Sequence, residues 1–214
     1  MPTDRRAGTG DGLFLVGLVG RAGSGKSTVA RALERAGAVV IDADALGHAV
    51  VNDDADVRAA LATEYGADVY GPAGLDRARV AAVVFRDAAA RDRLNRLVHP
   101  RIVARIHREL DALRARGFRG TVVVDAALLL DWGFERECDA VLAVDAPRDS
   151  QVARLVAARG WTPADVARRL DAQRPPEWFA ARADVTLVND GTPERMERAA
   201  LEAVDRLRAA QKGR

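Results

Sequence analysis

Residues 20–27 read Gly20-Arg21-Ala22-Gly23-Ser24-Gly25-Lys26-Ser27 and match the pattern G-x-x-x-x-G-K-[ST] in full. The octapeptide follows an apolar run over residues 13–19 and precedes a helical pattern over residues 26–36. Its glycines allow backbone conformations that other residues avoid and leave room for phosphate. Backbone N–H groups at the positive end of a helix then bind the β-phosphate. The segment therefore predicts the P-loop of a nucleoside triphosphate site.

Lysine is almost absent from the rest of the chain, which singles out Lys26. The chain has 33 Lys and Arg residues, of which only Lys26 and Lys212 are lysines. In a P-loop the lysine reaches the β- and γ-phosphates, and the next hydroxyl, here Ser27, ligates Mg²⁺. A glycine-rich turn that matches by chance is the alternative, but the strand, the helix and the lysine argue against it. The residues expected to bind the nucleotide are Gly20, Ala22, Gly23, Ser24, Gly25, Lys26, Ser27 and Thr28, with Lys26 catalytic and Ser27 the metal ligand.

Apolar runs without polar alternation predict strands that are buried on both faces of a parallel sheet. Helical patterns separate these runs, which is typical of an α/β fold with helices covering the sheet. We therefore expect a single P-loop domain over residues 13–210, with a parallel five-stranded sheet flanked by helices. The expected strands are residues 13–19, 39–41, 121–125, 140–145 and 185–188.

Helical patterns also predict two excursions from this core. Residues 55–116 contain several helical segments and no good strand, so they read as a helical insertion. Residues 147–182 are Arg-rich and helical, with breaks at Gly160, at Pro163 and at Pro175 and Pro176. We expect the last helix to run from about residue 193 to 209, and the ends, 1–12 and 211–214, to be disordered.

Composition excludes several classes of protein. The net charge of the 214-residue chain is only +2, too small an imbalance to argue for nucleic acid or an anionic membrane as a partner. The run 13–19 is too short to span a bilayer, and residues 1–12 do not resemble a signal peptide. Cys138 is the only cysteine, so no intrachain disulfide can form, and we expect a cytoplasmic protein.

The P-loop alone does not separate kinases from GTPases, motors or transporter ATPases. A Ras-like GTPase requires an N-K-x-D motif, and neither of the two lysines lies in one. The modest length with two helical excursions favours a kinase of a small molecule.

A second motif follows the P-loop at Ile41-Asp42-Ala43-Asp44. Its carboxylates come at the end of the second expected strand, near the edge of the sheet where ligands of α/β proteins bind. A carboxylate there could accept a proton from an attacking hydroxyl or hold a water on Mg²⁺. The alternative is that Asp44 caps the following helix, and both roles stay open.

Over residues 15–191 the sequence resembles the dephospho-CoA kinase family. The run G-S-G-K-S-T followed by I-D-A-D is similar to that family's pattern, and further short matches follow in the family's order. They are Tyr65-Gly66, Gly74-Leu75-Asp76-Arg77, Phe85, Leu97-Val98-His99-Pro100, Gln151 to Arg159 as Q-x-x-R-x-x-x-R, Gln173, and Ala183-Asp184 with Asn189.

The resemblance implies transfer of a phosphoryl group from ATP, with Mg²⁺, to the ribose 3′-hydroxyl of 3′-dephospho-CoA. It implies a P-loop kinase core with a helical substrate-binding insertion over 55–116 and a lid over 147–182. Asp44 would be the catalytic base and would contact the substrate together with Arg77, His99 and Leu128. Arg154 and Arg159 would be lid arginines that bind ATP, with Arg159 catalytic. The partner would be this small molecule, and the protein a monomer or weak homo-oligomer.

The sequence also departs from the family pattern. Arg21 and Ala22 replace Gly and Ile, His48 replaces Arg, and Phe179 replaces a basic residue, for which Arg174 or Arg182 could compensate. Residues 127–131 lack the usual Pro and end in Asp131 rather than Glu. Alternative readings are a P-loop kinase of another small metabolite and a nucleotide-binding regulator without turnover. For single residues, Arg77 could cap or pair on a helix, His99 could be structural, and the lid arginines could form a solvated face.

Overall fold

Five buried strands form the sheet that carries the P-loop. The computed structural model describes residues 12–212 and places these strands in the order β2-β5-β1-β6-β7. Strand β1 pairs in parallel with β5 and β6, and β6 pairs in parallel with β7. The predicted α/β fold with a parallel five-stranded sheet is confirmed. The strands are β1 (Leu13–Gly20), β2 (Val39–Asp42), β5 (Gly120–Asp125), β6 (Ala140–Asp145) and β7 (Val185–Val188).

The chain divides into two compact units, and the domain over residues 13–210 with its insertion over 55–116 and lid over 147–182 stays a prediction. The core unit comprises the described residues up to Ile41 and from Leu113 onward, and the helical unit comprises Asp42–Ala112. The helical unit therefore begins earlier than the expected insertion at residue 55. The residues expected to be disordered at 1–11 and 213–214 lie outside the described part of the chain.

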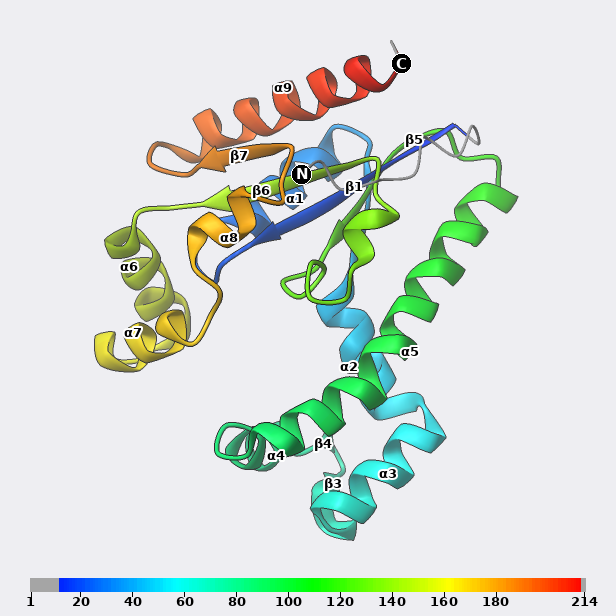
Figure 1. The fold of residues 1–214 in the computed structure, drawn as a ribbon, viewed down its shortest axis with the longest axis vertical. Coiled ribbons are helices and arrows are strands. Elements are labelled where there is room, and N and C mark those ends of the chain that lie inside the picture. The colour runs from blue at the N-terminus through cyan, green and yellow to red at the C-terminus, as the bar shows by residue number, and fades with distance from the viewer. Residues whose placement is uncertain (1–11, 213–214) are drawn as a thin grey trace. The chain divides into compact units, whose positions relative to one another are not determined.

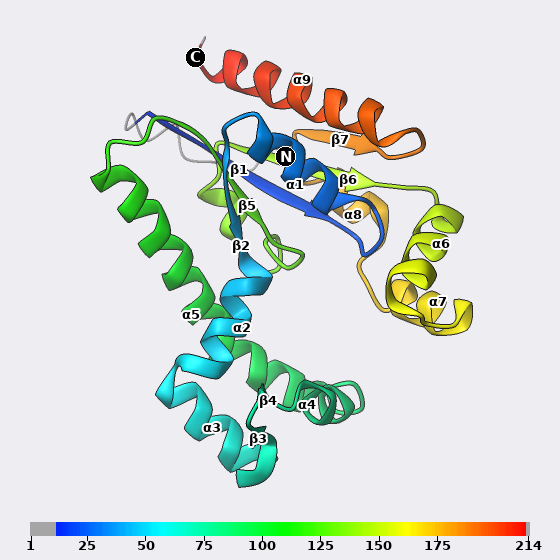
Figure 2. The ribbon, with the colours of Figure 1, turned by 180° about the vertical axis from the view of Figure 1, so that it is seen from behind.

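In the core unit, helices cover both faces of the sheet (Figures 1 and 2). Helices α1 (Lys26–Arg35) and α9 (Pro193–Lys212) pack on one face, and the short helix α8 (Pro176–Ala180) packs on the other. Alternate residues along the strands form the cluster under α1 and α9 because side chains of a strand alternate between its faces. Helix α9 continues to Lys212, so the expected end near residue 209 is wrong. The cluster contains Phe14, Val16, Leu18, Val29, Leu33, Leu142, Val144, Leu187, Met196 and Ala200.

The lid segment, which we define as residues 147–182, contains α6 (Arg148–Arg159), α7 (Pro163–Asp171) and α8. Its helices end where the sequence predicted breaks: Gly160 has a positive φ at the end of α6, and Pro163 begins α7. Thr162 caps α7 by accepting the backbone N–H of Asp165. The Thr162 hydroxyl in turn donates to the Asp165 carboxylate and holds the pKa of that carboxyl below its ordinary value.

The helical unit is built from short helices that aspartates begin. Asp42, Asp54 and Asp76 are the N-caps of their helices, and each side chain accepts backbone N–H groups of the first turn. Contrary to the sequence prediction, the unit also contains a two-stranded hairpin, β3 (Tyr70–Gly71) and β4 (Gly74–Leu75). The helices are α2 (Ala43–Asp53), α3 (Ala55–Tyr65), α4 (Arg77–Val84) and α5 (Ala88–Ala115), the last of which continues into the core unit.

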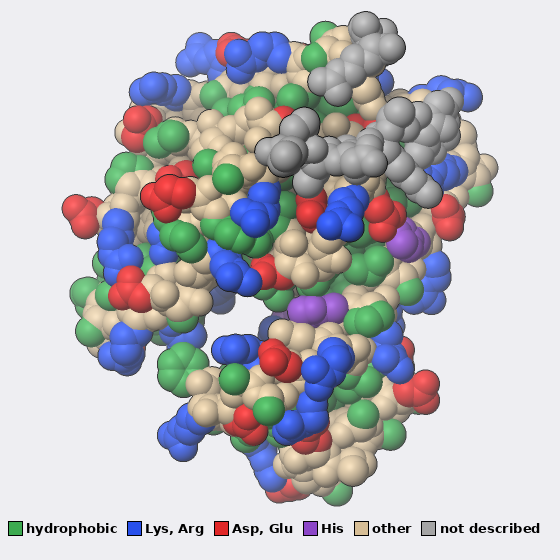
Figure 3. All heavy atoms as spheres, in the orientation of Figure 1, with side chains coloured by type: hydrophobic (Ala, Val, Ile, Leu, Met, Phe, Trp, Pro, Cys, Tyr) green, Lys and Arg blue, Asp and Glu red, His purple; other side chains and the backbone are tan. Residues whose placement is uncertain are grey.

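Basic and acidic side chains are interspersed over the face of the molecule drawn in Figure 3. Within residues 12–212, no helix is both long and apolar enough to cross a membrane.

Candidate active site

The P-loop begins where β1 ends, between two strands that end at the same edge of the sheet. Gly20 is in register with Val144 of β6, and Leu18 is in register with Asp125 of β5. The chain passes from β1 through α1 to β2 on one side, whereas β6 lies on the other side. Such a switch point at the carboxyl ends of parallel strands is where α/β proteins bind their ligands.

Two P-loop glycines cannot be replaced without displacing neighbouring groups. Gly25 is the N-cap of α1 with a φ of 99°, and a Cβ there would lie 2.1 Å from the Asn189 side-chain nitrogen. At Gly20 a Cβ would lie 2.4 Å from the backbone carbonyl oxygen of Val144. The absence of side chains therefore lets the loop lie against β6 and Asn189 while its first helical N–H groups stay available for an anion.

Side chains from two distant elements hold the outer carbonyls of the P-loop. The Ser24 carbonyl accepts from Asn189 Nδ2 at 2.9 Å and from Arg154 Nη1 at 3.3 Å. Arg154 Nη1 also donates to the Gly23 carbonyl at 3.1 Å. In a trans peptide the N–H points opposite to the C=O. Holding the Ser24 carbonyl outward therefore directs the Gly25 N–H to the inner side of the loop, where phosphate would bind.

Lys26 forms an ion pair with Asp125, the last residue of β5. The two side chains are only 17% and 14% exposed. Sequence reasoning named residues 121–125 as a strand but missed Asp125 as a site residue. The available signal was an acid that ends a buried apolar strand, because P-loop NTPases hold Mg²⁺ with an aspartate in that position.

The two predicted lid arginines do not lie together. Counted from Gln151, the pattern Q-x-x-R-x-x-x-R requires its second arginine at position 158, where this chain has Ala158. Arg159 comes one residue later and is exposed at the end of α6. Five residues of an α-helix correspond to a rotation of about 140°, so Arg154 and Arg159 lie on different faces. Only Arg154 contacts the P-loop, and a role for Arg159 at the triphosphate stays a prediction.

The outer tip of the P-loop contacts the lid segment through the two residues that depart from the family pattern. Arg21 Nη2 donates to the Leu170 carbonyl at 2.5 Å, and the Ala22 N–H donates to Gln173 Oε1 at 3.1 Å. Ala22 was expected to bind nucleotide, and in this structure Gln173 accepts its N–H. Neither Gln173 nor Asn189 was assigned to the site by sequence reasoning, although both belong to the resemblance.

Within the helical unit, Asp42 and not Asp44 caps helix α2. Asp42 Oδ1 accepts from the backbone N–H of Asp44 at 2.9 Å and of Ala45 at 3.0 Å. The alternative that Asp44 caps this helix is therefore wrong. Asp44 lies in the first turn and is exposed, so its carboxylate remains accessible.

Arg77, also in the helical unit, contacts His48, the residue that replaces a family arginine. The closest atoms are Arg77 Nη1 and His48 Nε2. A guanidinium has no acceptor, so Arg77 is the donor in this contact. His99 lies half-buried in α5, directly before Pro100, which the helix accommodates in its interior.

The turn after β5 carries Leu128, which was expected to contact substrate. Its carbonyl accepts the N–H groups of Asp131 and Trp132, and its side chain is 43% exposed. The shorter acid Asp131 pairs with Arg174 of the lid segment at 3.4 Å. Phe179, in place of a basic residue, is the buried residue of α8, so this position contributes to packing rather than charge.

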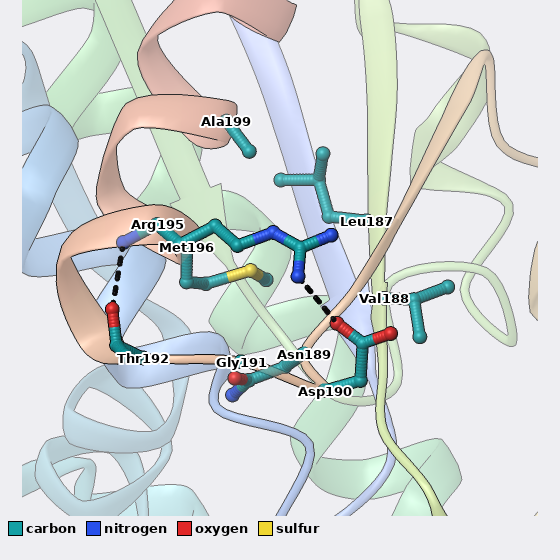
Figure 4. A pocket seen from close by; sticks show the side chains of 9 residues that line it. All are labelled: Leu187, Val188, Asn189, Asp190, Gly191, Thr192, Arg195, Met196 and Ala199. Atoms are coloured by element: carbon teal, nitrogen blue, oxygen red, sulfur yellow. Dashed lines mark hydrogen bonds and ion pairs between the residues drawn. The ribbon is translucent and has the colours of Figure 1, made fainter.

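A small pocket of about 90 Å³ lies between β7 and α9 (Figure 4). Apolar side chains of Leu187, Met196 and Ala199 line it, and an ion pair of Asp190 and Arg195 spans 3.7 Å at its polar side. Asn189 also lines the pocket and bonds Ser24. The pocket therefore adjoins the P-loop.

Comparisons with known proteins show the family of this chain. A family model for dephospho-CoA kinases matches residues 14–194. The dephospho-CoA kinase of Thermobifida fusca is 41% identical over 187 residues, which are 86% of this chain and 92% of that protein. A crystal structure from Thermus thermophilus has a TM-score of 0.75 at 33% identity, covering 89% of this chain and 95% of that one.

A dephospho-CoA kinase from Campylobacter jejuni, with a TM-score of 0.60 at 18% identity, shares the fold over 91% of this chain and 97% of its own. The predicted resemblance and the predicted kinase class are confirmed by the family model and the curated relative. The chain therefore belongs to the dephospho-CoA kinase family and is an ATP-dependent kinase, a transferase.

Proposed function

We propose that the protein transfers the γ-phosphoryl group of ATP to the ribose 3′-hydroxyl of 3′-dephospho-CoA, which gives coenzyme A and ADP. The observation that carries this proposal is the P-loop with its Lys26–Asp125 pair, in a chain that matches the dephospho-CoA kinase family over residues 14–194. The net charge of only +2 favours a small-molecule partner over nucleic acid. We expect a cytoplasmic protein that is a monomer or weak homo-oligomer.

The P-loop residues would bind and orient the triphosphate. Lys26 would leave Asp125 and contact the β- and γ-phosphates, where its charge stabilises the phosphoryl group in transfer. The N–H of Gly25, directed inward by the bonds to the Ser24 carbonyl, would donate to the β-phosphate. Because the Gly25 N–H is already directed inward, it would need little reorganisation to bind phosphate.

The residues beside Lys26 suit Mg²⁺. The Ser27 hydroxyl and the Asp125 carboxylate are hard oxygen donors, which this ion prefers. Within residues 12–212, no cluster of three or more His, Cys, Asp or Glu side chains could hold a metal. That agrees with an ion that is held mainly by phosphate oxygens and water. When bound, Mg²⁺ would neutralise charge on the β- and γ-phosphates.

The residues proposed for the acceptor are those that the resemblance assigns to it. Asp44 is accessible and would accept the proton of the 3′-hydroxyl or orient that hydroxyl. Arg77, His99 and Leu128 would contact dephospho-CoA. The lid segment would close over the nucleotide and exclude water, so that the phosphoryl group reaches the ribose rather than solvent.

The test is ADP formation with ATP and Mg²⁺ across a panel of acceptors that includes dephospho-CoA, pantetheine compounds, nucleosides and sugars. We expect rapid turnover with dephospho-CoA and at least a hundredfold lower kcat/KM with the others, because the ordinary range between specific and poor substrates is of this order. Preferred turnover of another acceptor would overturn the substrate assignment. Nucleotide binding without turnover on any acceptor would point to a regulator instead.

A further inference from the structure

Arg21 connects the P-loop to the second helix of the lid segment. Its Nη2 donates to the carbonyl of Leu170 at 2.5 Å, and Leu170 is a fully buried residue in the last turn of α7. The Leu170 carbonyl also accepts the Gln173 N–H at 3.2 Å, and carbonyls at the end of a helix carry partial negative charge. A guanidinium is therefore well suited to hold this end of the helix.

A second bond joins the same two segments. The Ala22 N–H donates to Gln173 Oε1 at 3.1 Å, and Gln173 lies two residues beyond the end of α7. Adjacent residues of the P-loop thus bind two points of the lid segment. On the next two P-loop residues, Arg154 of α6 holds the Gly23 and Ser24 carbonyls. Four consecutive P-loop residues therefore contact the lid segment.

The side chain of Arg21 is held mainly by its bond to Leu170. Its Nε is buried and, among the described residues, lacks a hydrogen-bond partner. A buried donor without a partner costs free energy, and the charge-assisted bond at Nη2 offsets that cost. The φ of Arg21 is not positive, so an alanine there keeps the loop conformation.

We propose that Arg21 is a positioning residue that holds α7 on the P-loop in the ligand-free protein. The lid segment is then partly ordered before ATP arrives, so ATP binding does not have to supply the whole ordering free energy. Gln173 acts with it through the Ala22 N–H. The kinetic part of this inference rests on the proposed kinase function, whereas the structural part does not.

Hydrogen exchange of the ligand-free protein tests the structural part. We compare wild type with Arg21→Ala, Arg21→Lys and the control Arg31→Ala, which removes an exposed arginine from α1. Amides of residues 163–173 should exchange about fivefold faster in Arg21→Ala, the scale of one partly exposed charge-assisted bond. Lys should restore part of the protection, and Arg31→Ala should leave it unchanged.

Kinetics test the positioning role. Arg21→Ala should raise the KM for ATP about fivefold with kcat within about twofold, and Arg21→Lys should recover part of that loss. Unchanged exchange over 163–173, equal acceleration across β1 and β6, or an unchanged KM would each overturn the proposal. If Arg21→Ala does not fold, Gln173→Ala replaces it, with the same expected direction. A wild type without turnover would refute the proposed function, while the exchange result would still decide whether Arg21 holds α7.

Discussion

Asp125→Asn removes the negative charge from the Lys26–Asp125 pair and keeps the size of the side chain. Removing one partner of a fully buried ion pair costs about 3–5 kcal/mol, because the other charge is left uncompensated. Here the side chains are 17% and 14% exposed, and the new amide oxygen still accepts one hydrogen bond. We therefore expect the free energy of unfolding to fall by about 1–2 kcal/mol. For a chain of this length, that lowers the Tm by roughly 2–8 °C.

The same substitution should change nucleotide affinity and rate in opposite directions. Lys26 would no longer have to leave a carboxylate before contacting phosphate, so ATP without metal should bind about three- to tenfold more tightly. The kcat with Mg²⁺ should fall about a hundredfold or more, because the carboxylate would no longer help to hold the metal. Scanning calorimetry measures the Tm, and titration calorimetry with EDTA measures the affinity for metal-free ATP. The ADP assay measures kcat.

A double-mutant cycle with Lys26→Ala measures the coupling free energy between Lys26 and Asp125, apart from the contacts that each side chain makes with other groups. If Lys26 and Asp125 stabilise each other, Asp125→Asn should cost little once Lys26 is absent, and the coupling should be about 1–2 kcal/mol. A coupling below about 0.3 kcal/mol, together with unchanged metal-free affinity, would refute the reasoning.

Three further outcomes are expected. Lys26→Ala should lower kcat by about two to four orders of magnitude in the ADP assay; retention of more than a tenth of the activity would exclude its phosphate role. Asp44→Asn should lower kcat about a hundredfold with little change in dephospho-CoA affinity. Asp42→Asn is its control, since asparagine caps a helix as well as aspartate. An equal loss of kcat in both variants would contradict the role of Asp44 as the base. Arg154→Ala should raise the KM for ATP more than Arg159→Ala, because only Arg154 contacts the P-loop; the reverse order would contradict the geometry.

The sheet could be predicted from sequence because its strands are buried on both faces. Residues 140–145 and 185–188 were predicted with the bounds that the structure gives, and the other three strands differ by one residue at an end. The P-loop could also be predicted from the sequence, because its conformation follows from a local pattern of glycines. Both features are encoded within a few neighbouring residues.

Features that depend on distant residues were not predicted. Nothing local to Asp125 indicates that Lys26 will lie against it, because β5 becomes the neighbour of β1 only in the folded sheet. Capping of α2 by Asp44 was left open as an alternative, and the structure gives the cap to Asp42, because the helix begins at Ala43. Arg159 was placed beside Arg154 by pattern, although one residue changes the helix face by about 100°.

The bond between Asn189 and Ser24 spans 165 residues of sequence. The P-loop motif is complete once residue 27 has been synthesised, but the Ser24 carbonyl has both of its side-chain donors, Arg154 and Asn189, only after β7 has joined the sheet. At roughly 5–20 residues per second, the ribosome needs on the order of ten to thirty seconds to reach that point. The nascent chain therefore carries the nucleotide motif long before it carries the complete set of contacts that hold the Ser24 carbonyl.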